Sequence, residues 1–320
     1  MKLIEERLDK VNETLEKESA EWRPKDREGR SGGLILLRQD IPTLIVPDLH
    51  GRRNYLPDLL RYKFKDKTVF ELLKTDRIQV VCVGDGMHSE RRGKERWQTA
   101  FAEYKNGFED CPAMTEEMTE NFQTMAMVMK LKGAFPQQFH FLKGNHENIL
   151  DEAGNGNHPF RKFAAEGPMT ASYVKKFYGD AFLNRYDRFE KNLPLLTRGK
   201  YFVITHARPK KVYSIDEVIN FRSEPAVTEG LTWTRSQNAE EGAIPSMLNE
   251  LIDSSITPRF WFCGHTSLKT RYKYWPEDAL IEIHNPDLRT VVILDPLVLF
   301  DLERHIVDLS QSANEAHQPE

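Results

Sequence analysis

The residues that could do chemistry in this 320-residue chain lie in five short segments, each pairing a carboxylate, carboxamide or imidazole with a small neighbour. In extended backbone, Asp48 and His50 point to the same side and can bind one ion together. Such donors without a thiolate suit Mn, Fe or Zn in an open, hydrolytic centre. The segments are Asp48-Leu49-His50-Gly51, Gly84-Asp85-Gly86, Gly144-Asn145-His146-Glu147, Thr205-His206-Ala207 and Gly264-His265-Thr266.

Each segment taken alone has a structural interpretation as well. An Asp after a strand is usually a helix cap or a turn former, and a single His is more often hydrogen-bonded than a metal ligand. Five such segments in succession are difficult to attribute to turn chemistry. Together they favour a metal site.

The five segments follow apolar runs that are typical of buried strands, so the strands would position them. Residues 32–40 and 41–51 predict a hairpin of two buried strands. Further strands are predicted within 77–86, 137–147, 200–209, 259–267, 278–285 and 289–296. Helical patterns cover 4–15, 56–74, about 114–132 and 159–192. This alternation predicts an α/β fold of sheets covered by helices, in which polar residues at the strand ends converge on a ligand.

The order DLHG, GDG, GNHE, THA and GHT resembles that of the calcineurin-like metallophosphoesterases, specifically the phosphoprotein phosphatase branch with its GDxHG, GDxVDRG, GNHE and HGG signatures. The resemblance covers roughly residues 34–294. It implies a four-layer αββα sandwich of two mixed β-sheets flanked by helices. The expected organisation is an N-terminal helix and loop over 1–33, the metallophosphoesterase domain over 34–305 with a helical insertion at about 90–133, and a polar tail over 306–320.

Carried over residue by residue, the resemblance implies that Asp48 and His50 bind one metal and that Asn145, His206 and His265 bind the second. Asp85 would bridge both ions, and His146 would be the general acid. Two cations, Mn, Fe or Zn, could share a hydroxide and clamp the phosphoryl oxygens for in-line attack on phosphorus. An imidazolium could then protonate the departing alkoxide.

Arginine is the residue type that binds phosphate through two parallel N–H donors, and four arginines are candidates. The spacing from Arg222 to Gly230 is similar to that of the family's phosphate-binding Arg, which makes Arg222 a catalytic and substrate-binding candidate. A surface salt bridge is the alternative. Arg208, two residues after His206, would contact substrate phosphate or close a loop through Asp216 or Glu217.

The second motif departs from GDxVDRG, since this chain has Gly84-Asp85-Gly86-Met87-His88-Ser89-Glu90-Arg91-Arg92-Gly93. His88 replaces the Asp that orients the acidic histidine, and Ser89 replaces the adjacent phosphate-binding Arg. The sequence permits Glu90 to hydrogen-bond His146, and Arg91 or Arg92 to reach the phosphate. A solvated run of charges is the structural alternative for this stretch.

Composition bounds the environment of the protein. The formal charge is -4, so no global positive field would gather nucleic acid or an acidic membrane, and neither is an expected partner. Of the three cysteines, Cys82 and Cys263 lie in apolar runs, which favours a reducing compartment. The first twenty residues lack the apolar stretch of a secretory signal, and no run reaches the roughly 20 apolar residues of a membrane span. We therefore expect a cytoplasmic protein.

Three functions are compatible with these patterns. The leading one is a metal-dependent phosphomonoesterase acting on phosphoserine or phosphothreonine, with a phosphoprotein as its partner. The second is hydrolysis of a nucleotide phosphoanhydride, as in the related diadenosine tetraphosphate hydrolases. The third is a metal-binding interaction module without catalysis, which the altered second motif keeps open.

Overall fold

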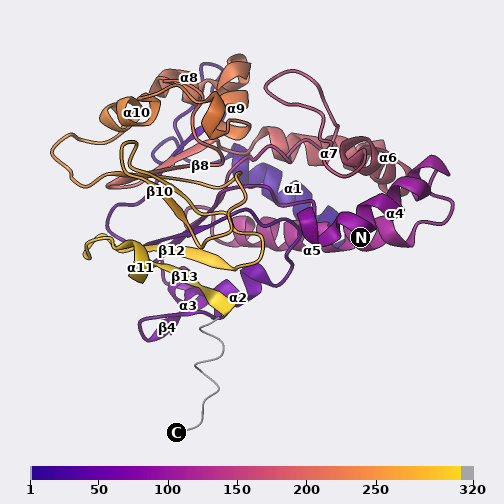
Figure 1. Ribbon diagram of the computed structural model, residues 1–320, viewed down its shortest axis with the longest axis horizontal. Helices are drawn as coiled ribbons and strands as arrows, with labels where there is room; N and C mark the ends of the chain where they lie inside the picture. Colours follow the sequence, from indigo (N-terminus) through magenta and orange to yellow (C-terminus); the bar gives the residue numbers. More distant parts are fainter. Residues whose placement is uncertain (1, 311–320) are drawn as a thin grey trace, which may run out of the picture.

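A computed structural model describes residues 2–310 and contains two large mixed sheets (Figure 1). The six-stranded sheet has the order β1 (Leu34–Leu36), β7 (Leu196–Arg198), β8 (Phe202–Thr205), β9 (Phe260–Cys263), β11 (Leu280–Glu282) and β10 (Lys273–Trp275). The five-stranded sheet has the order β13 (Ile306–Asp308), β12 (Thr290–Leu294), β2 (Thr43–Val46), β5 (Gln79–Cys82) and β6 (Phe139–Phe141). A small ribbon joins β3 (Lys63–Phe64) to β4 (Lys67–Thr68).

The helices fall into two groups, one for each sheet. The five-stranded sheet shares a buried cluster with α1 (Lys2–Glu16), α2 (Tyr55–Arg61), α3 (Val69–Lys74), α4 (Lys94–Lys105), α5 (Pro112–Ala134), α6 (Glu166–Tyr178) and α7 (Asp180–Lys191). The six-stranded sheet is covered by α8 (Ile215–Ile219), α9 (Pro225–Thr232) and α10 (Ala243–Leu251). Short helical turns complete the chain: η1 (Glu90–Gly93), η2 (Phe221–Ser223), η3 (Ser236–Asn238) and α11 (Leu302–His305). In Figure 1, α4 to α7 extend away from the sheets.

Alternating side chains of the strands explain why four layers form. Leu44 and Val46 of β2 face the helices, whereas Ile45 between them faces the other sheet. Strand β9 repeats the pattern in the second sheet, where Trp261 faces the helices and Phe262 faces inward. Because successive side chains of a strand point to opposite faces, two-sided burial needs an apolar layer on each side. The predicted αββα sandwich is confirmed.

The predicted hairpin of residues 32–51 was wrong, because its two strands belong to different sheets. Strand β1 pairs with β7, whereas β2 pairs with β5 and β12. Ile35 and Ile45 both face the layer between the sheets, one from each sheet. An apolar residue in that layer is compatible with a strand of either sheet, so local spacing did not distinguish the two. The other six predicted strands are present as β5, β6, β8, β9, β11 and β12.

Two of the predicted helices are interrupted. The 56–74 pattern divides into α2 and α3, with the β3–β4 ribbon between them. The 159–192 pattern divides into α6 and α7 at Gly179, whose φ of 83° lies in the left-handed region that glycine favours. The helices over 4–15 and 114–132 are present within α1 and α5.

The predicted polar tail begins too early. Strand β13 pairs antiparallel with β12, and Ile306 is buried in the layer between the sheets. The rest of that tail, 311–320, lies outside the described residues. At the other end, Leu8 and Val11 of α1 enter the same cluster as α5, so this helix is part of the main core.

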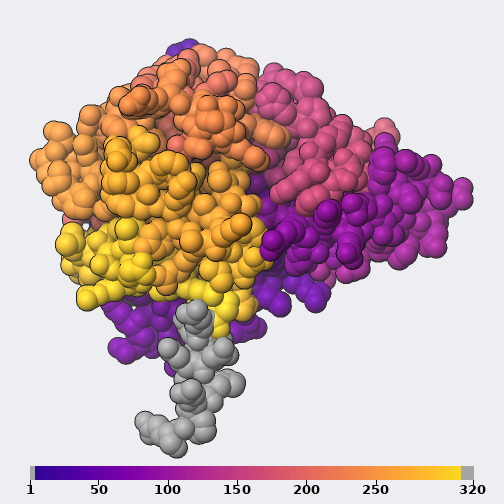
Figure 2. Space-filling view, in the orientation of Figure 1, coloured from indigo at the N-terminus to yellow at the C-terminus, as the bar shows by residue number. Residues whose placement is uncertain are grey.

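Among the described helices, none combines the length and apolar character that crossing a bilayer requires. Figure 2 shows the orange and yellow C-terminal part of the chain on one side of the molecular face and the purple and magenta helical part on the other.

Candidate metal centre

The six predicted ligands lie where parallel strands of both sheets end. Asp48, Asp85 and Asn145 follow β2, β5 and β6 of the five-stranded sheet, and these three strands are parallel. His206 and His265 follow the parallel strands β8 and β9 of the six-stranded sheet. The C-terminal ends of the strands therefore bring side chains from two sheets to one place, as the sequence predicted.

Contacts between these residues form a closed ring. From Nε2 of His50, Oδ2 of Asp48 and Oδ2 of Asp85 each lie 3.7 Å away. Oδ2 of Asp85 lies 3.5 Å from Nε2 of His206, which in turn is 3.0 Å from Oδ1 of Asn145. Oδ1 of Asn145 is 2.9 Å from Nδ1 of His265, and the backbone N–H of His265 donates to Oδ2 of Asp48 at 3.0 Å. The structure thus brings all six together, and their role as ligands stays a prediction.

Two of the three histidines, His50 and His206, present unprotonated nitrogens to this ring. Nδ1 of His50 lies 2.9 Å from the carbonyl of His88, and Nδ1 of His206 lies 3.0 Å from the carbonyl of Val83. Because a carbonyl oxygen only accepts, each Nδ1 carries the hydrogen and each Nε2 keeps its lone pair. Two lone pairs therefore face the carboxylate of Asp85, an arrangement that is repulsive unless a cation lies between the groups.

The backbone reaches this geometry through conformations that side chains rarely adopt. The φ angles of His50, Asp85 and His265 are 43°, 48° and 60°, in the left-handed region. A Cβ on Gly144 would lie 2.2 Å from Oδ1 of Asp85, and a Cβ on Gly264 would lie 1.9 Å from Oδ1 of Asp48. The small residues that flank the ligands are therefore required by close approach of the carboxylates.

Glu147 fixes the loop around Asp85. Its buried carboxylate accepts the backbone N–H groups of Asp85, Gly86 and Gly144 at 2.9, 2.8 and 2.7 Å. These three bonds satisfy buried donors at a point where the strands have ended. The Glu of the GNHE segment is thus a structural acceptor.

Electrostatics show that the ring fits cations. Burial raises the pKa of Asp48 to about 6, and burial with the neighbouring Asp48 raises the pKa of Asp85 well above its usual value. Burial also lowers the pKa of His50 and of His206 well below the ordinary value, which keeps both rings neutral. Within residues 2–310, neither aspartate forms an ion pair with Lys or Arg. The ring therefore combines two carboxyl groups, whose ionised forms burial disfavours without a cation, with neutral imidazoles, and such a donor set suits a metal ion.

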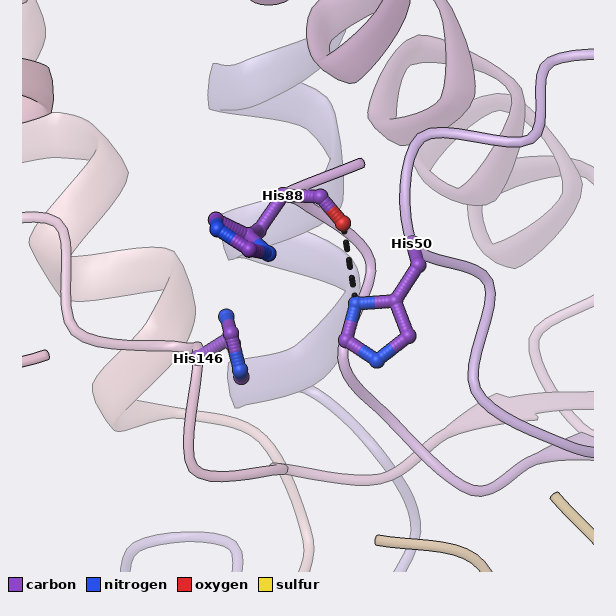
Figure 3. A group of neighbouring side chains, drawn as sticks. All are labelled: His50, His88 and His146. Atoms are coloured by element: carbon purple, nitrogen blue, oxygen red, sulfur yellow. Dashed lines mark hydrogen bonds between the residues drawn. The ribbon is translucent and has the colours of Figure 1, made fainter. Parts of the chain in front are cut away.

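His146 lies beside the ring with its ring nitrogen turned toward the shared carboxylate. Nε2 of His146 is 3.7 Å from Oδ2 of Asp85, and its backbone N–H donates to Oδ1 of the same residue at 3.0 Å. Phe160 packs against the imidazole, with ring centres 3.9 Å apart. Burial and the neighbouring His88 lower the pKa of His146 well below its ordinary value. Figure 3 shows the rings of His50, His88 and His146 around one shared space.

In the altered second motif, the contacts of Glu90 differ from those that the sequence suggested. Glu90 does not contact His146, because its carboxylate lies 3.1 Å from Nε2 of His284 and 3.4 Å from Nε2 of His50. His88 stacks on Trp97 with ring centres 5.0 Å apart and lies at the same distance from His146. His88 therefore occupies the place beside the predicted acid.

Sequence reasoning missed His284, which is fully buried and whose Nδ1 is 3.8 Å from Oδ2 of Asp48. The signal was present, because His284 follows strand β11 as the predicted ligands follow their own strands.

The structure shows the contacts of two of the predicted arginines, Arg222 and Arg208. Arg222 bonds to the carbonyl of Ser31 at 2.8 Å and to Oδ1 of Asn192 at 3.0 Å, and it pairs with Asp26. All three partners lie outside the ring, which favours the salt-bridge interpretation of Arg222, and its role stays a prediction. Arg208 pairs with Glu282 at 3.2 Å rather than with either partner that the sequence suggested, Asp216 or Glu217. The guanidinium of Arg208 also lies over Trp275.

Arg91 and Arg92 line a pocket of about 440 Å³ beside His50. Nη2 of Arg92 donates to the backbone carbonyl of His50 at 3.3 Å, and Nη1 pairs with Glu120. Arg91 is exposed and pairs with Asp287 at 2.9 Å. The pocket is also lined by Arg52, Ser89, Glu90 and Pro286. Both arginines thus line a pocket that is also lined by His50 of the ring.

A family model described as calcineurin-like phosphoesterase matches residues 41–293. The sequence matches none of the curated proteins with which it was compared. Among solved structures, the chain is similar to a protein serine/threonine phosphatase from Saccharomyces cerevisiae, with a TM-score of 0.60 and 13% identity over 96% of this chain and 88% of that one.

Two further structures are more distant. A cold-active protein-tyrosine phosphatase of a psychrophile Shewanella species has a TM-score of 0.44 and 13% identity over 82% of this chain and 77% of its own. A putative diadenosine tetraphosphatase has a TM-score of 0.45 and 15% identity over 87% of this chain and 97% of its own. At 13% identity and a TM-score of 0.60, the yeast protein shows a shared fold alone. The other two structures have TM-scores below 0.5 and support no inference.

Proposed function

Because this chain belongs to the calcineurin-like phosphoesterase family, we propose that it is a dinuclear-metal phosphomonoesterase of the serine/threonine protein phosphatase type. The observation that carries the proposal is the position of Asp85, whose Oδ2 lies 3.7 Å from Nε2 of His50 and 3.5 Å from Nε2 of His206. One oxygen can therefore serve two neighbouring ions. We propose Mn, Fe or Zn, because the donors are carboxylate, carboxamide and imidazole.

The residues of the ring divide into two ligand sets that share Asp85. Asp48 and His50 would hold one ion, and Asn145, His206 and His265 would hold the other. When bound, such a pair supplies positive charge to phosphoryl oxygens and lowers the pKa of water. The left-handed backbone at His50 and Asp85 fixes these side chains before substrate arrives, which limits reorganisation during the reaction.

We propose that His146 supplies the proton for the leaving alkoxide. Its Nε2 faces the ring, and Phe160 shields the imidazole. The imidazole of His146 is neutral in the free protein, since burial lowers its pKa. A phosphate dianion beside Nε2 would favour the protonated form, because an opposite charge within a few ångströms raises the pKa of a histidine. Protonation and substrate binding are then coupled at this residue.

Arg91 and Arg92 would recognise the phosphorylated substrate. The contact between Arg92 and the carbonyl of His50 holds one guanidinium at the mouth of the ring. We propose that a phosphoprotein segment enters along this pocket, which is open to solvent at Arg91. The three cysteines are all free, which agrees with the proposed cytoplasmic location.

One observation favours a second candidate function. Phe160 presents an aromatic ring directly beside His146, and aromatic faces are the surfaces on which bases stack. A nucleotide phosphoanhydride would place its base against such a ring while its phosphates lie at the ions. Nucleotide phosphoanhydride hydrolysis is therefore the alternative activity.

The test is a substrate panel on the full-length, Mn²⁺-loaded protein. Phosphoserine, phosphothreonine and phosphotyrosine peptides, a dinucleoside tetraphosphate and an aryl phosphate are compared by released phosphate or nucleotide. The proposal expects the highest kcat/KM on phosphoserine or phosphothreonine peptides and loss of turnover with EDTA. Preference for the dinucleotide would select the alternative, and two bound ions without turnover on any substrate would identify a non-catalytic binding module.

A further inference from the structure

His284 is a buried imidazole at the centre that the predicted ligand set does not use. It follows β11, the neighbour of β9 in the six-stranded sheet, and none of its surface is exposed. Its ring centre lies 5.3 Å from that of His50. His284, Asp48 and His50 each offer one ligand atom, and the three atoms lie within 4.8 Å of one another.

Contacts on its two nitrogens differ. Nε2 lies 3.1 Å from Oε2 of Glu90, and a carboxylate is an acceptor, so Nε2 carries the hydrogen. Nδ1 then keeps a lone pair, which faces Oδ2 of Asp48 at 3.8 Å. Within residues 2–310, Nδ1 has no hydrogen-bond partner. A buried acceptor that faces another acceptor is costly, because neither is satisfied.

We propose that His284, through Nδ1, is a further ligand of the ion held by Asp48 and His50, and that Glu90 orients its ring through Nε2. This inference rests on the proposed dinuclear function. Ligand atoms that share an ion with bonds of about 2.1 Å lie about 3.0–3.4 Å apart. The separations of Asp48 from His284 and from His50, 3.8 and 3.7 Å, exceed that range by only a few tenths of an ångström.

Glu90 completes an arrangement that is common around metal-bound histidines. A ligating His usually donates its other N–H to a carboxylate, which fixes the tautomer and the ring orientation. Glu90 is itself held by Lys162 at 3.3 Å and by the hydroxyl of Ser267 at 3.4 Å. With His284 included, the Asp48 ion has the donors Asp48, His50, Asp85 and His284. The second ion would have Asp85, Asn145, His206 and His265, so each ion would have four protein donors.

The test compares two substitutions of similar size at one position. In His284→Asn the amide can occupy the place of Nδ1, whereas in His284→Gln it can occupy the place of Nε2. Apoprotein is dialysed against buffered Mn²⁺, metal per chain is measured by mass spectrometry, and each Kd by calorimetry. We expect two ions in the parent. His284→Asn should retain both, one of them weakened, and His284→Gln should lose one ion or weaken it by about 10–100-fold more than His284→Asn.

Glu90→Gln provides the second arm. It should keep two ions per chain and raise one Kd by about 10–100-fold, the usual effect of removing a partner of a ligating His. Exposed His158, substituted by Ala, is the control and should change neither stoichiometry nor Kd.

Other outcomes are equally decisive. If His284 only bonds to Glu90 and binds no ion, His284→Gln would bind metal like the parent, because its amide can keep the bond to Glu90. His284→Asn would then be the variant with weaker metal binding, and this result would overturn the inference. Unchanged binding in both, with lower stability only, would identify a bridging imidazolium and also overturn it. A parent protein that binds fewer than two ions would instead refute the proposed dinuclear function.

Discussion

Oδ2 of Asp85, after a strand of the five-stranded sheet, lies 3.5 Å from Nε2 of His206, after a strand of the six-stranded sheet. The candidate centre thus spans the two sheets, and its geometry depends on how they pack. The carboxylate is also costly to bury, since burial and Asp48 raise its pKa well above the usual value. The residue that joins the two ligand sets is therefore expected to destabilise the metal-free fold.

Asp85→Asn should separate function from stability. Removing the shared charge should abolish binding of two ions and lower kcat/KM by at least about 10²–10³-fold. At pH 7 the metal-free variant should be as stable as the metal-free parent or more stable, because a buried charge has been removed. Metal content, turnover and urea unfolding in EDTA check these points, and a variant that binds two ions and turns over normally contradicts the bridging role.

His146→Ala should show a leaving-group dependence. An alkyl phosphate needs its leaving oxygen protonated, so kcat on a phosphoserine peptide should fall by about 10²–10⁴-fold. An aryl phosphate with an acidic phenol leaves without that proton, so its rate should fall far less. Asn148→Ala, two residues along the same loop, is the control. Equal losses on both substrates would argue against His146 as the general acid.

Arg92→Ala should weaken substrate binding more than chemistry. The guanidinium lies at the pocket mouth beside His50, so we expect KM for phosphopeptides to rise about tenfold, the loss of one charge-assisted contact of roughly 1.4 kcal/mol. Arg92→Lys keeps the positive charge, so its KM should rise less than that of Arg92→Ala. Steady-state kinetics on both variants give the answer, and an unchanged KM would assign Arg92 to its ion pair with Glu120 alone.

Arg222→Ala should reduce stability and spare catalysis. Its guanidinium connects Asp26 and Ser31 to Asn192, and the loss of buried hydrogen bonds should cost about 1–3 kcal/mol of unfolding free energy. Turnover of the folded variant should stay within about threefold of the parent. A large fall in kcat without a change in unfolding would restore the catalytic role that the sequence suggested.

Glu18→Gln should lower stability in a pH-dependent way. Burial alone would raise the pKa of Glu18, but Lys132 and Arg23 outweigh it and lower the pKa to about 2. Since the unfolded value is about 4.3, the ionised group contributes up to about 3 kcal/mol at neutral pH. This contribution is complete above the unfolded pKa and is lost as pH falls toward 2.

Urea unfolding of parent and Glu18→Gln between pH 7 and pH 3 measures this difference. The difference in unfolding free energy between the parent and Glu18→Gln should be constant from pH 7 to about pH 5 and should become smaller below pH 5. Glu13→Gln removes an exposed pair with Lys17 near the C-terminal end of α1, and should have no measurable effect. A gap that stays constant down to pH 3 would show that the stabilisation does not depend on the charge of Glu18.

The sequence by itself indicated strands buried on both faces and the residues of the candidate centre. Consecutive apolar residues in a strand, such as Leu44, Ile45 and Val46, require burial on both faces, and polar residues at the ends of parallel strands meet at one edge. These are local patterns, readable from a few neighbouring residues. Asp48, Asp85 and His206 could therefore be named as one cluster without a structure.

Only the tertiary structure decided the partners of side chains that are distant in sequence. His284 meets Glu90 across 194 positions, and Arg222 meets Asp26 across 196, so no local pattern indicates either contact. The same holds for β1 and β2, which local spacing assigns to a hairpin and packing assigns to opposite sheets. Which donor meets which acceptor depends on how the two sheets and their helices come together, and that is fixed by burial over the whole chain.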